Sequence, residues 1–252
     1  MKIVMLAGKG DSSKFVFNEI QKYYPIIKVL EEESPNKFNM IRNRVRRVGW
    51  INVIGQIMFL LFSKLLKVKS KNRIKKLIED YELSKSPINE RVLKHVTSVN
   101  SDEAIEELKH LDPDIVIVNG TRIISQKVLS SVRAKFINTH LGITPKYRGV
   151  HGGYWAIANN DMGNCGTTVH LVDKGIDTGG ILYQGVIKID SSDNYCTYPI
   201  HQVSIGIKLM LKALGDAEKN NLRIVENDLE SKLWYHPEIW TYIKNYLLWK
   251  IK

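Results

Sequence analysis

The stretch Phe136-Ile137-Asn138-Thr139-His140 predicts a buried strand that ends in polar side chains. Alternate residues of a strand point to the same face, so Asn138 and His140 are expected to address one point at its carboxyl end. Further along, Gly175-Ile176-Asp177-Thr178-Gly179-Gly180 predicts a tight loop that carries a carboxylate. An amide, an imidazole and a carboxylate can together stabilise an oxyanion and move a proton. Each segment taken alone also fits an ordinary polar turn.

Upstream of this strand, apolar runs alternate with amphipathic segments. Buried strands are expected at 2–7, 26–30, 114–119 and 135–138, and helical segments at 12–24, 101–111 and 128–133. This alternation predicts the α/β class, with a Rossmann-like, doubly wound and mostly parallel sheet and helices on both faces. Ligands of such sheets lie at the carboxyl ends of strands, where both Asn119 and His140 fall.

The length of 252 residues, with 44% hydrophobic and 25% charged residues, is typical of one main globular domain with extensions. We expect a catalytic domain over residues 1–190, with a basic helical insertion at about 37–90, and a C-terminal helical extension over 191–252. The first apolar run is too short for the core of a secretory signal. Only two cysteines occur, without metal-ligand spacing, so a reducing compartment and no metal site are expected.

The segment from Lys37 to Lys76 is strongly basic. It contains 12 Lys or Arg residues and no acidic residue, while the whole chain has a net charge of +11, so the remainder is nearly neutral. Between its basic clusters, 50–62 predicts a helix that is too short, and too interrupted by Gly55 and Gln56, to span a membrane, which takes about 20 residues. Three interpretations remain open: a helical hairpin packed on the core or on a second copy in a homodimer, an anionic membrane surface, and a polyanionic ligand such as a nucleotide diphosphate or RNA.

Taken in order, Asn138-Thr139-His140, then Pro145 to Gly149, then Asp177 ahead of Gly179-Gly180, resemble the folate-dependent formyltransferases. These include the glycinamide ribonucleotide enzymes and the catalytic domain of the methionyl-tRNA enzymes. The run from Gly166 to Val172 is similar to the strand that leads into the family's Asp loop. The resemblance implies the formyltransferase fold and transfer of a formyl group from 10-formyltetrahydrofolate to a primary amine. It gives oxyanion stabilisation to Asn138 and His140, and proton removal to Asp177.

The resemblance also implies two sets of binding residues. The cofactor pocket would be built from a strand-to-loop segment and from the Asp loop that closes its other side: Asn119, Arg122, Ile123, Ile124, Asp173 and Gly175. The amine substrate would lie beside the first loop of the chain and the loop after His140: Gly8, Lys9, Gly10, Lys146, Tyr147, Arg148, His151 and Tyr154. An ordinary strand-to-helix loop, or an aromatic core anchor at Tyr154, is the competing interpretation for these positions.

The run Arg148-Gly149-Val150-His151-Gly152-Gly153-Tyr154 is similar to the branch that acts on nucleotide-linked amino sugars in surface-polysaccharide (O-antigen) biosynthesis. Open alternatives are a phosphoribosylglycinamide or methionyl-tRNA formyltransferase, a formyltetrahydrofolate hydrolase, and a non-catalytic membrane-associated binding module. Nucleic acid is not expected as a partner, because the methionyl-tRNA enzymes carry a sizeable additional C-terminal domain and only a short segment follows the last core strand here. A cytoplasmic enzyme is expected, and a peripheral position at the inner face of a membrane stays open.

Overall fold

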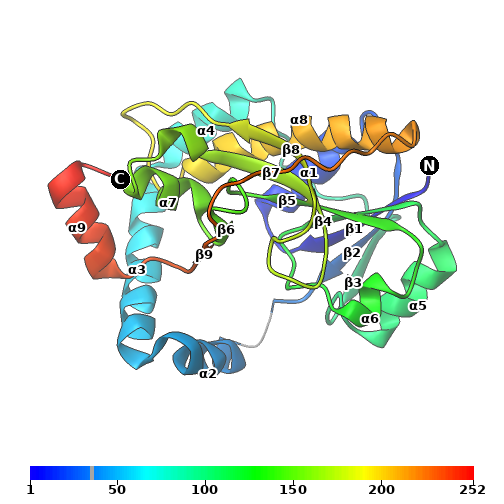
Figure 1. The fold of residues 1–252 in the computed structure, drawn as a ribbon, viewed down its shortest axis with the longest axis horizontal. Coiled ribbons are helices and arrows are strands. Elements are labelled where there is room, and N and C mark those ends of the chain that lie inside the picture. The colour runs from blue at the N-terminus through cyan, green and yellow to red at the C-terminus, as the bar shows by residue number, and fades with distance from the viewer. Residues whose placement is uncertain (35–36) are drawn as a thin grey trace.

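The computed structural model describes residues 1–34 and 37–252 (Figure 1). Its centre is a seven-stranded sheet in the order β3-β2-β1-β4-β5-β7-β8. The strands are β1 (Ile3–Gly8), β2 (Ile26–Glu32), β3 (Leu93–Val96), β4 (Ile115–Asn119), β5 (Lys135–His140), β7 (Gly166–Leu171) and β8 (Ile181–Val186). The first five strands pair in parallel, and β7 and β8 add antiparallel neighbours beyond β5. The predicted α/β class and mostly parallel sheet are confirmed.

Helices cover both faces of the sheet, as the alternation along the chain predicts (Figure 1). On β1, Ile3 and Met5 pack toward α1 (Asp11–Ile20) and α8 (Tyr198–Glu218), while Val4 and Leu6 pack toward α5 (Asp102–Leu111) and α6 (Gln126–Leu129). Both sets are fully buried because a parallel strand in this fold has no solvent face. The helix α5 begins at the expected place, where the Ser101 hydroxyl accepts a hydrogen bond from the Ala104 amide.

The helix α8, which falls in the predicted C-terminal helical extension over 191–252, packs on the sheet. It lies against β5, β7, β8 and α1 and shares their hydrophobic cluster. The remaining part of that expected extension consists of a short strand β9 (Leu233–Trp234) and α9 (Ile239–Trp249). The strand β9 pairs in parallel with β6 (Arg148–Gly149), so the C-terminal segment returns to the loop that follows β5.

The expected basic insertion forms three helices, α2 (Lys37–Val48), α3 (Trp50–Lys69) and α4 (Lys71–Asp80). The prediction that the apolar helix is too short to cross a membrane is wrong. With 20 residues, α3 is long and apolar enough by length and composition, because the helix continues past Phe62. The helix α3 continues through Gly55 without a break. The ring of Trp240 on α9 occupies the space that a side chain at Gly55 would fill.

The helix α8 approaches the sheet closely at Gly206. A Cβ atom at Gly206 would lie 2.5 Å from Cγ2 of Thr139 and 3.1 Å from Cγ2 of Thr167. We expect Gly206→Ala to lower the free energy of unfolding in urea by about 1–3 kcal/mol through overpacking. The matched control is Gly215→Ala on the same helix, where a Cβ would lie 3.4 Å from the Tyr24 hydroxyl, and helix propensity should raise stability by about 0.5–1 kcal/mol. Equal effects at both positions would contradict this packing.

Candidate active site

The polar side chains at the end of β5 face the antiparallel strand β7. Register places Asn138 opposite His170, and the side-chain amide of Asn138 lies 3.1 Å from Nε2 of His170. Nδ1 of His170 lies 2.7 Å from the carbonyl oxygen of Leu171. Since a carbonyl can only accept, Nδ1 carries the proton of the neutral ring, and Asn138 donates to Nε2. His170 on the neighbouring strand β7 thus fixes the orientation of the Asn138 side-chain amide.

His140 is buried at the same strand end, with 6% of its surface exposed. Its Nε2 lies 2.7 Å from the carbonyl oxygen of Tyr147, to which it donates, and its Nδ1 lies 3.2 Å from Oδ2 of Asp177. Asp177 also approaches His170, with 3.7 Å between Oδ1 and Nε2. Asn138, His140 and Asp177, which the sequence assigns to one site, are therefore brought together by the structure.

Asp177 reaches this position because its loop is held from several sides. The residue itself has a left-handed backbone with φ of 51°, which Asp tolerates better than most residues. Its carboxylate accepts a hydrogen bond of 2.9 Å from the Gly149 amide, and the Arg148 guanidinium donates to the carbonyl of Ile176 at 3.1 Å. Asp173, an expected cofactor residue, instead braces the loop by accepting from the amide of Gly175 at 2.9 Å.

Gly149 is required at its position for two reasons. Its φ is 94°, which disfavours any side chain, and a Cβ there would lie 2.3 Å from the carbonyl oxygen of Trp234. The close pairing of β6 with β9 is therefore what places the Gly149 amide against Asp177.

Burial and hydrogen bonding act differently on the pKa values of His140 and Asp177. It lowers the pKa of His140, and the nearby Asp177 carboxylate and the Tyr147 carbonyl only partly oppose this. Burial alone would raise the pKa of Asp177, but its contacts with His170, His140 and the Gly149 amide outweigh burial, so the pKa lies below its ordinary value. At neutral pH the site therefore combines an ionised carboxylate with an imidazole that can accept a proton.

No sequence motif indicates a role for His170, although it lies within the run from Gly166 to Val172 that resembles the family strand. The missing information is the pairing of β7 with β5, which joins residues far apart in the chain. Glu32 was missed for a similar reason. This buried carboxylate accepts from the Arg122 amide at 2.6 Å and lies 2.6 Å from the Arg122 Nε. No local pattern marks either residue.

The residues expected on the cofactor side follow β4. Asn119 is buried and donates to the hydroxyls of Ser12 and Ser13, so it ties β4 to the first turn of α1. Ile124 is buried, whereas the side chain of Ile123 is 52% exposed. The guanidinium of Arg122 is paired with Glu32, so Arg122 is not a free cation. This ion pair instead holds the backbone of the loop in place. Ile123 and the loop backbone are thus the parts open to a flat ligand.

The first loop lies beside this segment. A Cβ at Gly8 would lie 2.0 Å from the carbonyl oxygen of Gly120, so a glycine is needed where the ends of β1 and β4 meet. Lys9 and Gly10 are exposed, and Gly10 directly precedes α1. These positions remain available to an anionic substrate, because free amides at a helix start attract negative charge.

Several expected substrate contacts lie in the core instead. Tyr147 is fully buried and its hydroxyl donates to Asp161, while the hydroxyl of Tyr154 accepts from Asn245. Nε2 of His151 lies 2.7 Å from the Tyr195 hydroxyl and 3.0 Å from Nδ1 of His236. For the side chains of Tyr147, His151 and Tyr154, the structure supports packing rather than substrate contact.

Lys146 lies at the edge of this cluster, where its Nζ is 2.6 Å from Oδ2 of Asp161. Of the loop residues expected to bind substrate, Tyr147 contacts His140 through its carbonyl, and Arg148 contacts the Asp177 loop at the carbonyl of Ile176.

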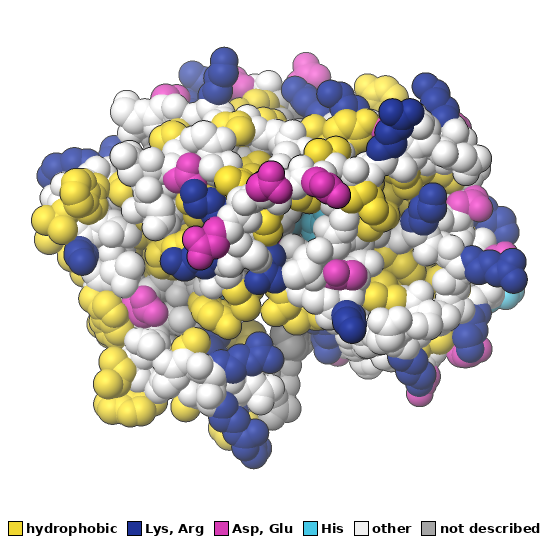
Figure 2. All heavy atoms as spheres, in the orientation of Figure 1, with side chains coloured by type: hydrophobic (Ala, Val, Ile, Leu, Met, Phe, Trp, Pro, Cys, Tyr) yellow, Lys and Arg dark blue, Asp and Glu magenta, His cyan; other side chains and the backbone are white. Residues whose placement is uncertain are grey.

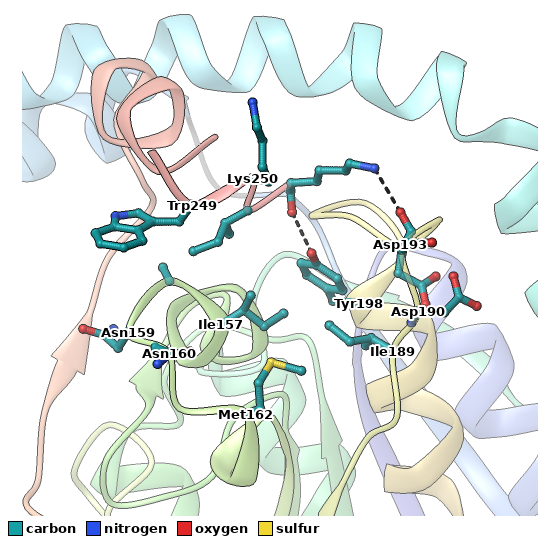
Figure 3. A pocket seen from close by; sticks show the side chains of 14 residues that line it. Ile157, Asn159, Asn160, Met162, Ile189, Asp190, Asp193, Tyr198, Trp249 and Lys250 are labelled. Atoms are coloured by element: carbon teal, nitrogen blue, oxygen red, sulfur yellow. Dashed lines mark hydrogen bonds between the residues drawn. The ribbon is translucent and has the colours of Figure 1, made fainter. Parts of the chain in front are cut away.

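A separate cavity of about 760 Å³ lies between the end of α7 (Gly152–Ala158) and the last residues of the chain (Figure 3). Its walls include Ile157, Met162 and Trp249, and none of the predicted site residues lines it. On its rim the Tyr198 hydroxyl donates to the carbonyl of Lys252. No histidine is among the described residues that line this cavity, so it does not present the imidazole that acyl transfer would use.

The family model described as formyl transferase matches residues 63–213, which is more than half of the chain. The chain belongs to this family. It is 30% identical over 166 residues to the methionyl-tRNA formyltransferase of Caldanaerobacter subterraneus subsp. tengcongensis, an alignment that covers 63% of the chain and 53% of that protein. It is 37% identical over 123 residues to the methionyl-tRNA formyltransferase of Halothermothrix orenii, covering 48% and 39%. The chain spans about half the length of such curated relatives.

Solved formyltransferase structures share the fold. A sugar N-formyltransferase from Shewanella sp. has a TM-score of 0.56 at 16% identity, covering 92% of this chain and 76% of its own. An N-formyltransferase from Helicobacter canadensis has a TM-score of 0.55 at 18% identity, covering 93% and 71%. The phosphoribosylglycinamide formyltransferase from Anaplasma phagocytophilum has a TM-score of 0.57 at 15% identity, covering 92% and 98%. The expected formyltransferase fold is thereby confirmed.

The half-buried pair His151 and His236 predicts acid lability. Burial lowers the pKa of His151 to about 3 and that of His236 to about 4, against about 6.5 in an unfolded chain. Between these values the unfolded state binds more protons, so the free energy of unfolding should fall as pH decreases from 6.5 toward 4. We expect a loss of about 2 kcal/mol per histidine at pH 4.5, measured by urea unfolding.

A double variant, His151→Gln with His236→Gln, should unfold with a shallower dependence on pH, whatever its stability at pH 7. The control is His95→Gln on β3, because 57% of that side chain is exposed. An unchanged pH dependence in the double variant would contradict the assignment of neutral buried rings.

Proposed function

We propose that this protein transfers a formyl group from 10-formyltetrahydrofolate to a primary amine. The observation that carries the proposal is the buried contact of 3.2 Å between His140 and Asp177 at the carboxyl end of β5, with Asn138 two residues before His140. Together with membership of the formyl transferase family, this cluster supplies the groups for attack on a formyl carbon.

In the proposed mechanism the amine lone pair attacks the formyl carbon, and the carbonyl oxygen becomes an oxyanion. The Asn138 amide donates a hydrogen bond to that charge. His140 adds to the stabilisation once its Nδ1 has taken up a proton, since its Nε2 already donates to the Tyr147 carbonyl. Asp177 accepts the proton that the attacking nitrogen loses, directly or through a water molecule. The bond between carbon and N10 of the folate then breaks, and N10 takes up a proton, which leaves a formamide and tetrahydrofolate.

The donor would bind between two loops that the sheet brings to one edge. The segment after β4 offers its backbone and the exposed Ile123, and the loop from Asp173 to Gly180 closes the opposite side. This placement supports a folate pocket, because a pterin combines a flat apolar face with donors and acceptors along its edge. The Helicobacter canadensis N-formyltransferase was solved with folinic acid, which supports the same class of donor here.

We propose a nucleotide-linked amino sugar as the acceptor, in surface-polysaccharide biosynthesis in the cytoplasm. Two observations support this class. The run from Arg148 to Tyr154 is similar to the sugar branch, and the Helicobacter canadensis structure contains dTDP-3-aminofucose. The exposed first loop at Lys9 and Gly10 would lie nearest the phosphates. Arg148 would act by holding the Asp177 loop.

Methionyl-tRNA is a second candidate acceptor. Relatives that are 30% to 37% identical are methionyl-tRNA formyltransferases, and the basic segment 37–76 would suit an RNA backbone. The two acceptors can be separated directly by offering purified protein each amine in turn, with 10-formyltetrahydrofolate as donor, and by measuring tetrahydrofolate release.

Substitution of the central pair should abolish turnover. We expect His140→Asn and Asp177→Asn each to lower kcat by about 10²–10⁴-fold. The first variant removes the imidazole beside the oxyanion, and the second removes the carboxylate that takes the proton from the attacking nitrogen. Matched controls are His95→Asn and Asp102→Asn, both exposed and distant from β5, which should retain full activity. Rates like those of the unaltered protein in either site variant would reject the proposal, and release of tetrahydrofolate without any amine would indicate a hydrolase.

The dependence of kcat/KM on pH gives an independent test. Because burial lowers the pKa of His140, the acidic limb should lie below the ordinary histidine value of about 6.5. The Asp177 carboxylate raises the pKa of His140, so the limb should move to still lower pH in the residual activity of Asp177→Asn. A limb at or above pH 6.5, unchanged by the substitution, would contradict this assignment.

A further inference from the structure

One side of α3 exposes a continuous row of large apolar side chains. They recur at the three- and four-residue spacing that aligns residues along one face of a helix. The exposed members are Trp50, Ile51, Ile54, Ile57, Met58, Leu61, Phe62, Leu65 and Val68. Single exposed apolar residues are normal on protein surfaces, but a continuous row along about five helical turns marks an interaction surface.

The opposite side of α3 is fixed to the protein. Phe59 is fully buried, with its ring 4.7 Å from Tyr195 and 5.0 Å from Tyr242 on α9. Gly55 gives room to Trp240, as described above. Because these contacts run along its length, α3 lies on the body of the protein, and spanning a bilayer would require breaking them. The exposed row is thus suited to lie along a surface.

Neighbouring helices widen the apolar area. In Figure 2 yellow side chains gather along the left edge of the molecule, over α9 and α3, and near the lower left corner where α2 meets α3. The exposed residues of α9 are Trp240, Ile243, Tyr246, Leu247, Leu248 and Trp249, and those of α2 include Met40, Ile41 and Val45. We call the exposed apolar residues of α2, α3 and α9 the apolar face.

The three helices that form the apolar face contain basic residues and no acidic residue. No acidic residue occurs between 37 and 76 or between 239 and 252. Exposed basic residues stand on α2 and on the second half of α3: Arg42, Arg46, Arg47, Lys64, Lys67 and Lys69. The combination of large apolar and aromatic side chains with a cationic border is typical of helices that lie in the headgroup region of anionic membranes.

We propose that the apolar face docks this protein onto an anionic lipid surface, with α3 and α9 lying in the plane of the headgroups. A second copy of the chain fits the charges less well, because a two-fold contact would place the basic border of one copy against that of the other. RNA would pair with the cations but would leave the row of Leu, Ile, Met and Val exposed. A lipid surface uses both features.

The test is sedimentation of the full chain with vesicles of phosphatidylcholine alone or containing about 30 mol% phosphatidylglycerol. We expect binding to the anionic vesicles only, weakened by raising NaCl from about 0.1 to 0.5 M. Leu61→Asp with Leu65→Asp removes apolar contact, and Arg46→Glu with Arg47→Glu reverses charge. Each pair should lower the fraction bound at least about tenfold.

Matched controls carry the same changes elsewhere. Tyr23→Asp with Val186→Asp alters exposed apolar residues, and Lys208→Glu with Lys219→Glu reverses exposed charges on α8 and just after it. Both should bind as the unaltered protein does, and equal thermal unfolding would show that each variant is folded. Vesicle binding is measured without folate or amine, so it is independent of the proposed formyl transfer.

Three outcomes would overturn the proposal. The first is no binding to anionic vesicles at about 0.1 M NaCl, or equal binding to both vesicle types. The second is a concentration-dependent dimer in analytical ultracentrifugation that Leu61→Asp with Leu65→Asp converts to monomer, without vesicle binding by the unaltered chain. The third is binding to tRNA that Arg46→Glu with Arg47→Glu abolishes, again without vesicle binding.

Discussion

The position of one carboxylate governs the arrangement of the candidate site. Asp177 can contact His140 only if its loop folds back over the end of β5, and this requires a left-handed backbone at Asp177 itself. The Gly149 amide, presented by the pairing of β6 with β9, holds the carboxylate in place. The C-terminal segment therefore contributes to the chemistry without supplying a reacting group, since β9 fixes the strand that orients Asp177.

The sequence predicts those parts of the molecule that local patterns encode. The order of apolar runs identifies the sheet, and Asn138, His140 and Asp177 are found by their spacing and by resemblance to the family. His170 and Glu32 escape notice because their roles depend on pairing between distant strands. The same limit explains why Tyr147, His151 and Tyr154 were expected at the substrate. The partners of His151 and Tyr154, namely Tyr195, His236 and Asn245, lie between 44 and 91 residues away in the chain, and the Tyr147 hydroxyl bonds to Asp161 across 14 residues.

The basic insertion is anchored to the sheet by ionic contacts as well as by packing. Arg73 on α4 lies 2.7 Å from Asp190 and 2.9 Å from Asp193, in the loop before α8. Burial alone would raise the pKa of Asp193, but the Arg73 guanidinium and other hydrogen bonds outweigh it and hold the pKa at about 2. Removing one partner of such a pair would leave a buried charge uncompensated. The orientation of α4, and of α3 before it, is thus fixed relative to the central sheet.

This anchoring bears on the exposed apolar row of α3. Burying a large apolar side chain contributes about 1.5–3 kcal/mol, so a helix that is free to rotate would turn its most apolar side inward. On α3 the inward side contains Gly55, Gln56 and Phe59, while larger residues remain outside. Gly55 admits the Trp240 ring, and Phe59 fills the space beside Tyr195, so the inward side is selected by shape rather than by hydrophobicity. The outward row is then a fixed feature of the folded chain, held at a constant orientation to the edge of the sheet where His140 and Asp177 meet.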